Sequence, residues 1–94
     1  DEDKILGLYQ LDNMNVYIDR AMLKNPKVLG GFNDQPGLVE MTQRAIDTLS
    51  KNENGFFLMV EGACVDKQLH VMDWQRAAYD NIELDQEICC RKRQ

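Results

Sequence analysis

The chain has 94 residues, of which 44% are hydrophobic and 29% are charged. This length suits one small domain and is too short for two. The net charge of −5 argues against a nucleic-acid-binding surface, because such surfaces are basic. The longest apolar run, residues 56–60, is far too short to span a membrane, and the acidic first residues do not resemble a signal peptide.

The first third of the sequence predicts one strand and a long irregular connection. Residues 4–9 have the composition of a short strand, and residues 12–15 have that of a turn. Residues 16–23 are amphipathic and fit a short helix or an extended segment equally well. Residues 25–37 are rich in Gly, Pro and Asn, which predicts a loop.

A helix is predicted next, because Leu38, Met41, Ala45 and Leu49 recur at helical spacing. Glu40 in the first turn complements the helix dipole. The segment Asn52-Glu53-Asn54-Gly55 predicts the end of this helix, with its glycine in a left-handed turn.

The apolar run 56–60 then predicts a strand buried on both faces, as in a parallel sheet covered by helices. A second helix is predicted from about Asp73, as N-cap, to Ile88. Its apolar positions are Trp74, Ala77, Ala78, Ile82, Leu84 and Ile88. Helix, strand and helix make an α/β unit, in which ligands gather at the carboxyl ends of the strands. Glu61 lies at that end.

Glu61, Asp66 and His70 form the candidate site. Asp66 and His70, the only histidine, lie four residues apart and therefore on one face of a helical turn. A carboxylate with an imidazole suits zinc, whereas Glu61 suits a hard ion such as Mg²⁺. The alternative is that these are ordinary surface residues. Asp and His four residues apart occur by chance on many solvated helices, and a Glu at a strand end often pairs with Arg. Two protein ligands also leave a tetrahedral zinc two positions short.

A longer pattern surrounds these residues. It reads L-x-E-M-T at 38–42, K-N-x-x-G-F-F-L-x-V-E-G at 51–62 and D-x-x-x-H at 66–70. This block resembles the alkaline phosphatase family, and the likeness extends over about residues 4–86. The remainder, 87–94, departs from the family pattern, for which a frameshift or truncation is one hypothesis.

The resemblance implies a fragment of a three-layer αβα sandwich, mostly helical with about two strands, in which 1–86 is an internal segment of the domain. It implies that Glu61 binds magnesium and that Asp66 and His70 bind one of two catalytic zinc ions. Lys67 matches a position that lies near the bound phosphate in some bacterial members. Cys64 is interpreted as a small packing residue.

The family hydrolyses phosphate monoesters through a phosphoserine, so the resemblance implies this activity for a full-length enzyme. It also implies a homodimer and a periplasmic or secreted location. The family's nucleophile lies in an Asp-Ser-Ala context that is absent here, where Ser50 is the only serine. The 94-residue chain is therefore expected to be inactive alone. Alternatives are a non-catalytic α/β interaction module, or another phosphoesterase of the superfamily such as a sulfatase or mutase.

Overall fold

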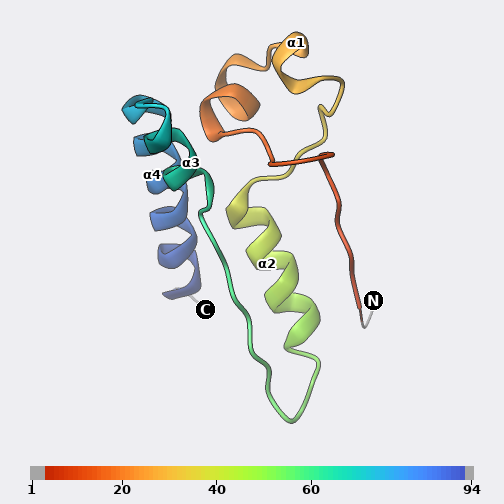
Figure 1. The fold of residues 1–94 in the computed structure, drawn as a ribbon. Coiled ribbons are helices and arrows are strands. Elements are labelled where there is room, and N and C mark those ends of the chain that lie inside the picture. The colour runs from red at the N-terminus through yellow and green to blue at the C-terminus, as the bar shows by residue number, and fades with distance from the viewer. Residues whose placement is uncertain (1–3, 93–94) are drawn as a thin grey trace.

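The computed structural model describes the backbone of residues 4–92 and the side chains of residues 4–89. Within residues 4–92, five helices follow one another (Figure 1). They are the π-helix η1 (Ile18–Leu23), α1 (Pro26–Leu29), α2 (Leu38–Leu49), α3 (Cys64–His70) and α4 (Trp74–Lys92).

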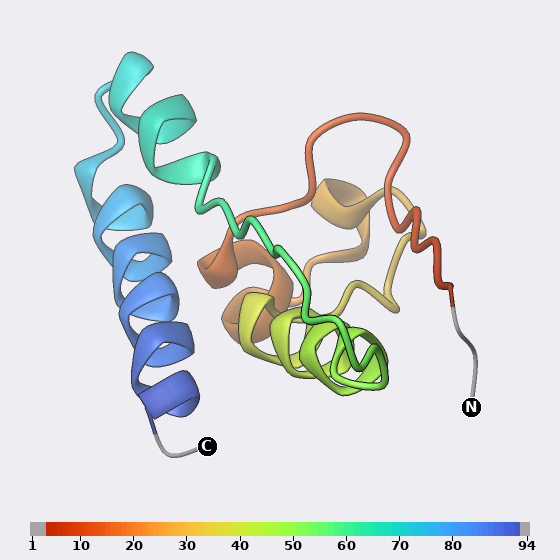
Figure 2. The ribbon, with the colours of Figure 1, turned by 90° about the horizontal axis from the view of Figure 1, so that it is seen from below.

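The longest helix, α4, organises the molecule. It packs against α3 and α2 and also touches η1. Figures 1 and 2 show α3 folded back beside the first turns of α4, with a long extended segment joining α2 to α3. Residues 4–9 form a second extended segment on the other side of the molecule from α4 (Figures 1 and 2).

The predicted α/β class was wrong for this chain. Residues 4–9 and 56–60 are extended, but neither belongs to a strand or sheet anywhere in residues 4–92. The physical reason is that a strand requires a neighbour for its backbone hydrogen bonds, and these two segments make none with each other. Apolar composition marked them as able to join a sheet but did not supply a partner, so the fragment of an αβα sandwich is not observed.

The two main helices were predicted correctly. α2 has the predicted bounds, its N-terminal Gly37 N–H donates to Glu40 Oε1 over 3.4 Å, and Gly55 has the expected positive φ of 87°. The backbone N–H of Arg76 donates to Asp73 Oδ1 over 3.2 Å, which is the predicted N-cap of α4. This helix continues past the predicted end at Ile88 to Lys92.

The undecided segment 16–23 is helical, and the predicted loop after it contains a short helix. The N–H of Lys24 donates to the carbonyl of Asp19 over 3.0 Å, a five-residue spacing typical of a π-helix. Asn25 then caps α1, since its side chain accepts a hydrogen bond from Lys27 N over 3.0 Å.

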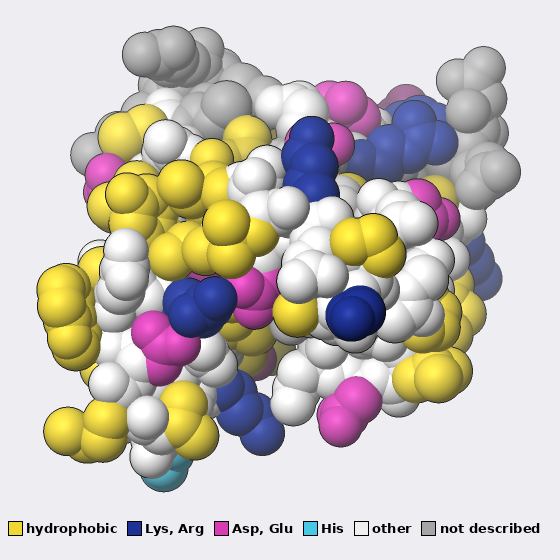
Figure 3. All heavy atoms as spheres, turned by 90° about the horizontal axis from the view of Figure 1, so that it is seen from above, with side chains coloured by type: hydrophobic (Ala, Val, Ile, Leu, Met, Phe, Trp, Pro, Cys, Tyr) yellow, Lys and Arg dark blue, Asp and Glu magenta, His cyan; other side chains and the backbone are white. Residues whose placement is uncertain are grey.

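The inward face of α4 is mainly acidic, contrary to the predicted apolar stripe. Its buried residues are Ala77, Asp80, Glu83 and Glu87. Of the predicted apolar positions, Trp74, Ala78, Ile82 and Ile88 are exposed. Figure 3 shows many apolar side chains, in yellow, on the surface of the molecule. Hydrophobic periodicity located the helix but did not show which of its faces turns inward.

Ion pairs and hydrogen bonds explain how this acidic face is buried. Arg20 Nη2 contacts both carboxylate oxygens of Glu83, at 2.7 and 2.9 Å, and the two side chains are only 11% and 10% exposed. Asp80 accepts a hydrogen bond from Tyr17 N over 2.8 Å. These contacts fasten η1 to α4, because buried carboxylates require donors in place of water.

We predict that Arg20→Met destabilises the chain by about 3 kcal/mol, because it leaves Glu83 buried without its cation. The double variant Arg20→Met/Glu83→Leu is expected to lose less, since it removes both charges. Urea denaturation followed by circular dichroism measures both.

Arg44→Met is the matched control, because Arg44 is exposed and its loss should change the free energy of unfolding by no more than about 0.5 kcal/mol. A double variant that is less stable than Arg20→Met would contradict this account of the pair.

Candidate functional site

Asp66 and His70 lie on one face of α3, as their spacing predicted. His70 Nε2 and Asp66 Oδ2 are 3.1 Å apart, and the side chains are 73% and 81% exposed, respectively. The histidine, in cyan in Figure 3, lies at the surface. The pair is therefore preformed and open to solvent, where an ion can reach both atoms.

The donor atoms of this pair are of the kinds that bind zinc, an imidazole nitrogen and a carboxylate oxygen. The 3.1 Å between Nε2 and Oδ2 is the distance of a direct hydrogen bond between the two side chains. The pair supplies half of a tetrahedral shell.

Glu61 lies elsewhere, at the end of the extended segment before α3. It is exposed and lines a cavity of about 330 Å³. Other residues of the lining include Asp12, Arg20, Asp80 and Glu83. Gly62 follows directly and lies close to α4: a Cβ there would be 3.2 Å from Leu84 Cδ2. The glycine thus allows the segment carrying Glu61 to approach α4.

The structure does not gather the predicted metal ligands into one centre. No group of three or more His, Cys, Asp or Glu side chains is placed to hold a metal ion within the part of the chain that the structure describes. The assignment of Glu61 to magnesium and of Asp66 and His70 to zinc therefore stays a prediction.

Lys67, the predicted phosphate-proximal residue, is exposed on α3. It lines a separate cavity of about 300 Å³ together with Asn13, Asp19 and Cys64. The ammonium group can reach solvent here, and its role also stays a prediction.

The polar cluster of Arg20, Asp80 and Glu83 was missed in the sequence. It lines the same cavity as Glu61. Burial raises the pKa of Asp80 above its ordinary 3.8, with nearby Glu83 adding to the effect, while the hydrogen bond from Tyr17 opposes it. The only sequence signal is the three-residue spacing of the two acids on α4, which is also common on solvated helices.

Cys64 packs at the start of α3 and is half-buried. Its Sγ lies 3.5 Å from the carbonyl oxygen of Met14. Burial raises the pKa of its thiol above 9.0, and the negative charge of Asp80 raises it further. This environment disfavours the reactive thiolate.

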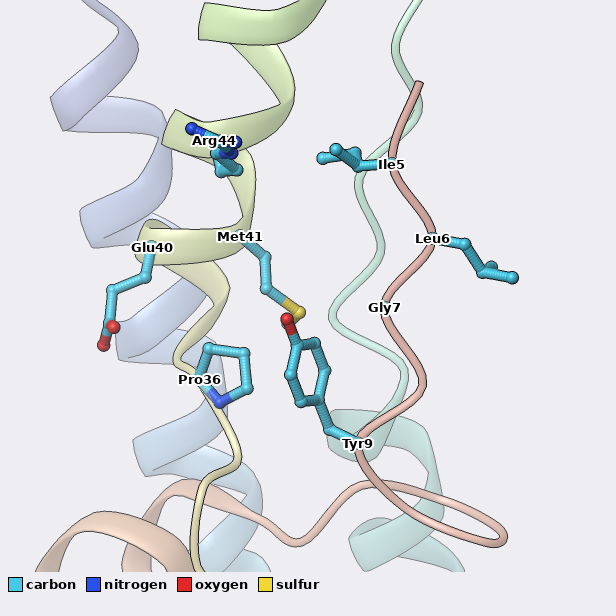
Figure 4. Close-up of a pocket in the computed structure, with 8 residues that line it drawn as sticks. All are labelled: Ile5, Leu6, Gly7, Tyr9, Pro36, Glu40, Met41 and Arg44. Atoms are coloured by element: carbon cyan, nitrogen blue, oxygen red, sulfur yellow. The ribbon is translucent and has the colours of Figure 1, made fainter. Parts of the chain in front are cut away.

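A larger cavity of about 520 Å³ lies between residues 5–9 and α2. Figure 4 shows Tyr9 beside Met41, and Ile5 directed toward α2 while Leu6 is directed away. Glu40 and Arg44 provide its charged lining. None of the four residues predicted for the site lines this cavity, so its size does not make it the functional centre.

Comparison with known proteins adds independent information on the family. A family model described as alkaline phosphatase matches residues 1–91. The chain belongs to the alkaline phosphatase family. This confirms the family inferred from the motif at 38–70.

Individual relatives agree with this. An alkaline phosphatase of Escherichia fergusonii is 47% identical over 99 aligned residues, which cover 93% of this chain and 21% of that protein. The tissue-nonspecific isozyme of Felis catus is 35% identical over 86 residues, covering 92% of this chain and 14% of that protein. The chain thus spans about a fifth or less of the length of these relatives. No solved structure matches.

No helix within residues 4–92 has the length and apolar character needed to cross a membrane. The proposed boundary between residues 86 and 87 is tested neither by the comparisons nor by the structure, and it stays a prediction.

The raised pKa of Asp80 predicts a definite pH dependence of stability. As the pH rises above 3.8, the unfolded chain releases this proton before the folded chain does. The unfolded state then gains relative stability until the folded carboxyl also ionises. We expect Asp80→Asn, whose amide oxygen can still accept from Tyr17 N, to remove this contribution.

Asp80→Asn should therefore be at least as stable as wild type at pH 7, with the difference between them shrinking toward pH 3. Thermal melts across this pH range measure it. Asp85→Asn, an exposed carboxylate on the same helix, is the control. If Asp80→Asn is less stable than wild type at pH 7, the hydrogen bond from Tyr17 N requires a charged carboxylate at position 80.

We also predict that Cys64 reacts with iodoacetamide more slowly than Cys89 at pH 8, because Cys64 is half-buried with a raised pKa and Cys89 is exposed. Mass spectrometry of two single-cysteine variants, Cys89→Ser/Cys90→Ser and Cys64→Ser/Cys90→Ser, measures the two rates. Equal rates in the folded chains would refute the burial of Cys64, and unfolding in urea should abolish the difference.

Proposed function

We propose that this chain is part of a metal-dependent phosphomonoesterase, an alkaline phosphatase, that hydrolyses phosphate monoesters. The observation that carries the proposal is the family match over residues 1–91, which includes Asp66 and His70, side by side on one face of α3. A sulfatase or mutase of the same superfamily is less well supported, because the matching family model is that of the alkaline phosphatases.

Three side chains have metal-binding roles in this proposal. Asp66 Oδ2 and His70 Nε2 bind one of two zinc ions, and Glu61 binds magnesium. When bound, such ions act as Lewis acids that polarise phosphoryl oxygens and lower the pKa of coordinated water. Because the imidazole must be neutral to bind, zinc affinity should weaken at acid pH.

Lys67 has a weaker, electrostatic role in the proposal. Lys67 is exposed and follows Asp66 on α3. The proposal assigns its ammonium group to the neighbourhood of the substrate phosphate. An alkylammonium acts on phosphate as a point charge and does not require the fixed geometry of an arginine. Substitution of Lys67 should therefore weaken phosphate binding more than it changes the metals.

The complete enzyme is proposed to react through a phosphoserine. Ser50 is not assigned this role, because its hydroxyl donates to the carbonyl of Ile46 at the end of α2. We therefore expect no turnover of an aryl phosphate by the 94-residue chain alone. By family resemblance, the complete enzyme is proposed to be a homodimer with a periplasmic or secreted location.

A chimeric enzyme tests the function directly. The matching segment of the Escherichia fergusonii alkaline phosphatase is replaced by residues 1–91 of this chain, and hydrolysis of an aryl phosphate is measured. We expect an active chimera in which Asp66→Ala or His70→Ala reduces kcat/KM by more than the about 10- to 100-fold typical of residues that only support a ligand.

Asp85→Ala is the control within the same chimera, since Asp85 is an exposed acid outside the proposed site. Glu61→Gln should remove the dependence of activity on added magnesium while zinc remains bound. Full activity of the His70→Ala chimera would refute the proposal.

Zinc binding to the 94-residue chain is a second test. Calorimetry should show weak binding, because two ligands form an incomplete shell, and His70→Ala should abolish it. Asp85→Ala should titrate like wild type. Identical titrations of wild type and His70→Ala would favour the alternative of a non-catalytic interaction module for this chain.

A further inference from the structure

The turn between α3 and α4 is closed by two backbone hydrogen bonds. The N–H of Met72 donates to the carbonyl of Leu69 over 3.1 Å, and the N–H of Asp73 donates to the carbonyl of Gln68 over 2.9 Å. These two spacings, with Met72 at a φ of 61°, make a Schellman motif at the end of α3. Glycine usually occupies the left-handed position of this motif. A methionine there costs backbone strain that the surrounding contacts must offset.

Side chains join the same two residues across the turn. Gln68 Nε2 donates to Asp73 Oδ2 over 3.3 Å. Asp73 Oδ1 accepts from the backbone N–H of Arg76 and so caps α4. One carboxylate therefore holds the last turn of α3 and the first turn of α4 together. This matters for α3, because a helix of seven residues is not stable by itself and depends on contacts with its neighbours.

Arg76 extends this link to η1. Its Nη1 lies 3.2 Å from Asp73 Oδ2, and its Nη2 lies 2.9 Å from Asp19 Oδ1. Asp19 belongs to η1, and the next residue, Arg20, lines the cavity that Glu61 also lines. The contacts thus connect α3, through the start of α4, to the helix beside Glu61.

We propose that Gln68 and Asp73 are positioning residues that fix α3 against α4. In this way they set the place of the Asp66–His70 pair relative to Glu61, a role that rests on the proposed function. The hydrogen bond between Asp66 and His70 lies within one helical turn, so it does not determine where α3 as a whole lies. Gln68 is on the same helix and partly buried, and its contact with Asp73 supplies that constraint.

Gln68→Leu tests the link, because it removes the amide donor and keeps a good helix former of similar size. Amide hydrogen exchange of the 94-residue chain, followed by mass spectrometry, measures how often α3 opens. After correction for intrinsic rates, residues 64–70 should exchange at least about threefold faster than in wild type, the effect of losing one such hydrogen bond. Residues 38–49 of α2 should exchange as in wild type.

Gln75→Leu is the matched control, because it makes the same change at an exposed position of α4. It should leave the exchange of α3 unchanged. Gln68→Lys keeps a donor on this side chain for Asp73, and its α3 should exchange more slowly than that of Gln68→Leu. Equal exchange of α3 in wild type and Gln68→Leu would overturn the proposal.

The chimera with the Escherichia fergusonii enzyme tests the positioning role. Zinc bound per folded molecule is titrated against buffered free zinc, and kcat/KM is measured on the same samples. Gln68→Leu should lower the zinc affinity about 10- to 100-fold, as is typical of residues that support a metal ligand, whereas Gln75→Leu should not change it. A purely structural role would lower the yield of folded chimera without changing the zinc affinity of the folded molecules.

Failure of this inference is distinguishable from failure of the proposed function. If His70→Ala inactivates the chimera but Gln68→Leu binds zinc as tightly as the unsubstituted chimera, the proposed function stands and the positioning role is overturned. Full activity of the His70→Ala chimera would overturn both.

Discussion

The ion pair between Arg20 and Glu83 is the contact on which the arrangement of the helices depends. It joins η1 to α4 with both oxygens of Glu83 within 2.9 Å of one guanidinium nitrogen. A Cβ at Gly37 would lie 3.3 Å from Glu83 Oε2 and 3.4 Å from Arg20 Nη1, so the start of α2 also lies against the pair. The helices η1, α2 and α4, which are distant in sequence, thus meet at this ion pair.

Around this ion pair the usual distribution of side chains is reversed, with acidic residues buried and apolar residues exposed. Acidic residues line the inward face of α4, while Trp74, Phe57 and Met59 are exposed. Directional contacts to carboxylates specify one relative placement of helices, but their net contribution to stability is small because burying each charge costs solvation.

The candidate site contains one contact that local structure forms and one residue that long-range packing positions. Asp66 and His70 meet because one helical turn brings positions i and i+4 together, and this needs nothing from the remaining chain. Glu61 lies instead beside the buried cluster, in a cavity that exists only because α4 and η1 come together. A complete metal centre would require further ligands and a fixed distance between these two places, which short-range geometry alone does not supply.

The sequence by itself determined the family, the bounds of α2, the N-cap of α4 and the Asp66–His70 pair, because each follows from residues close together in the chain. It could not determine whether residues 4–9 and 56–60 form strands, since a ladder depends on a neighbour and not on composition. It also could not show that α4 turns Asp80 and Glu83 inward. That orientation was decided by tertiary structure, because only the approach of Arg20 and of Tyr17 N makes the burial of two carboxylates favourable.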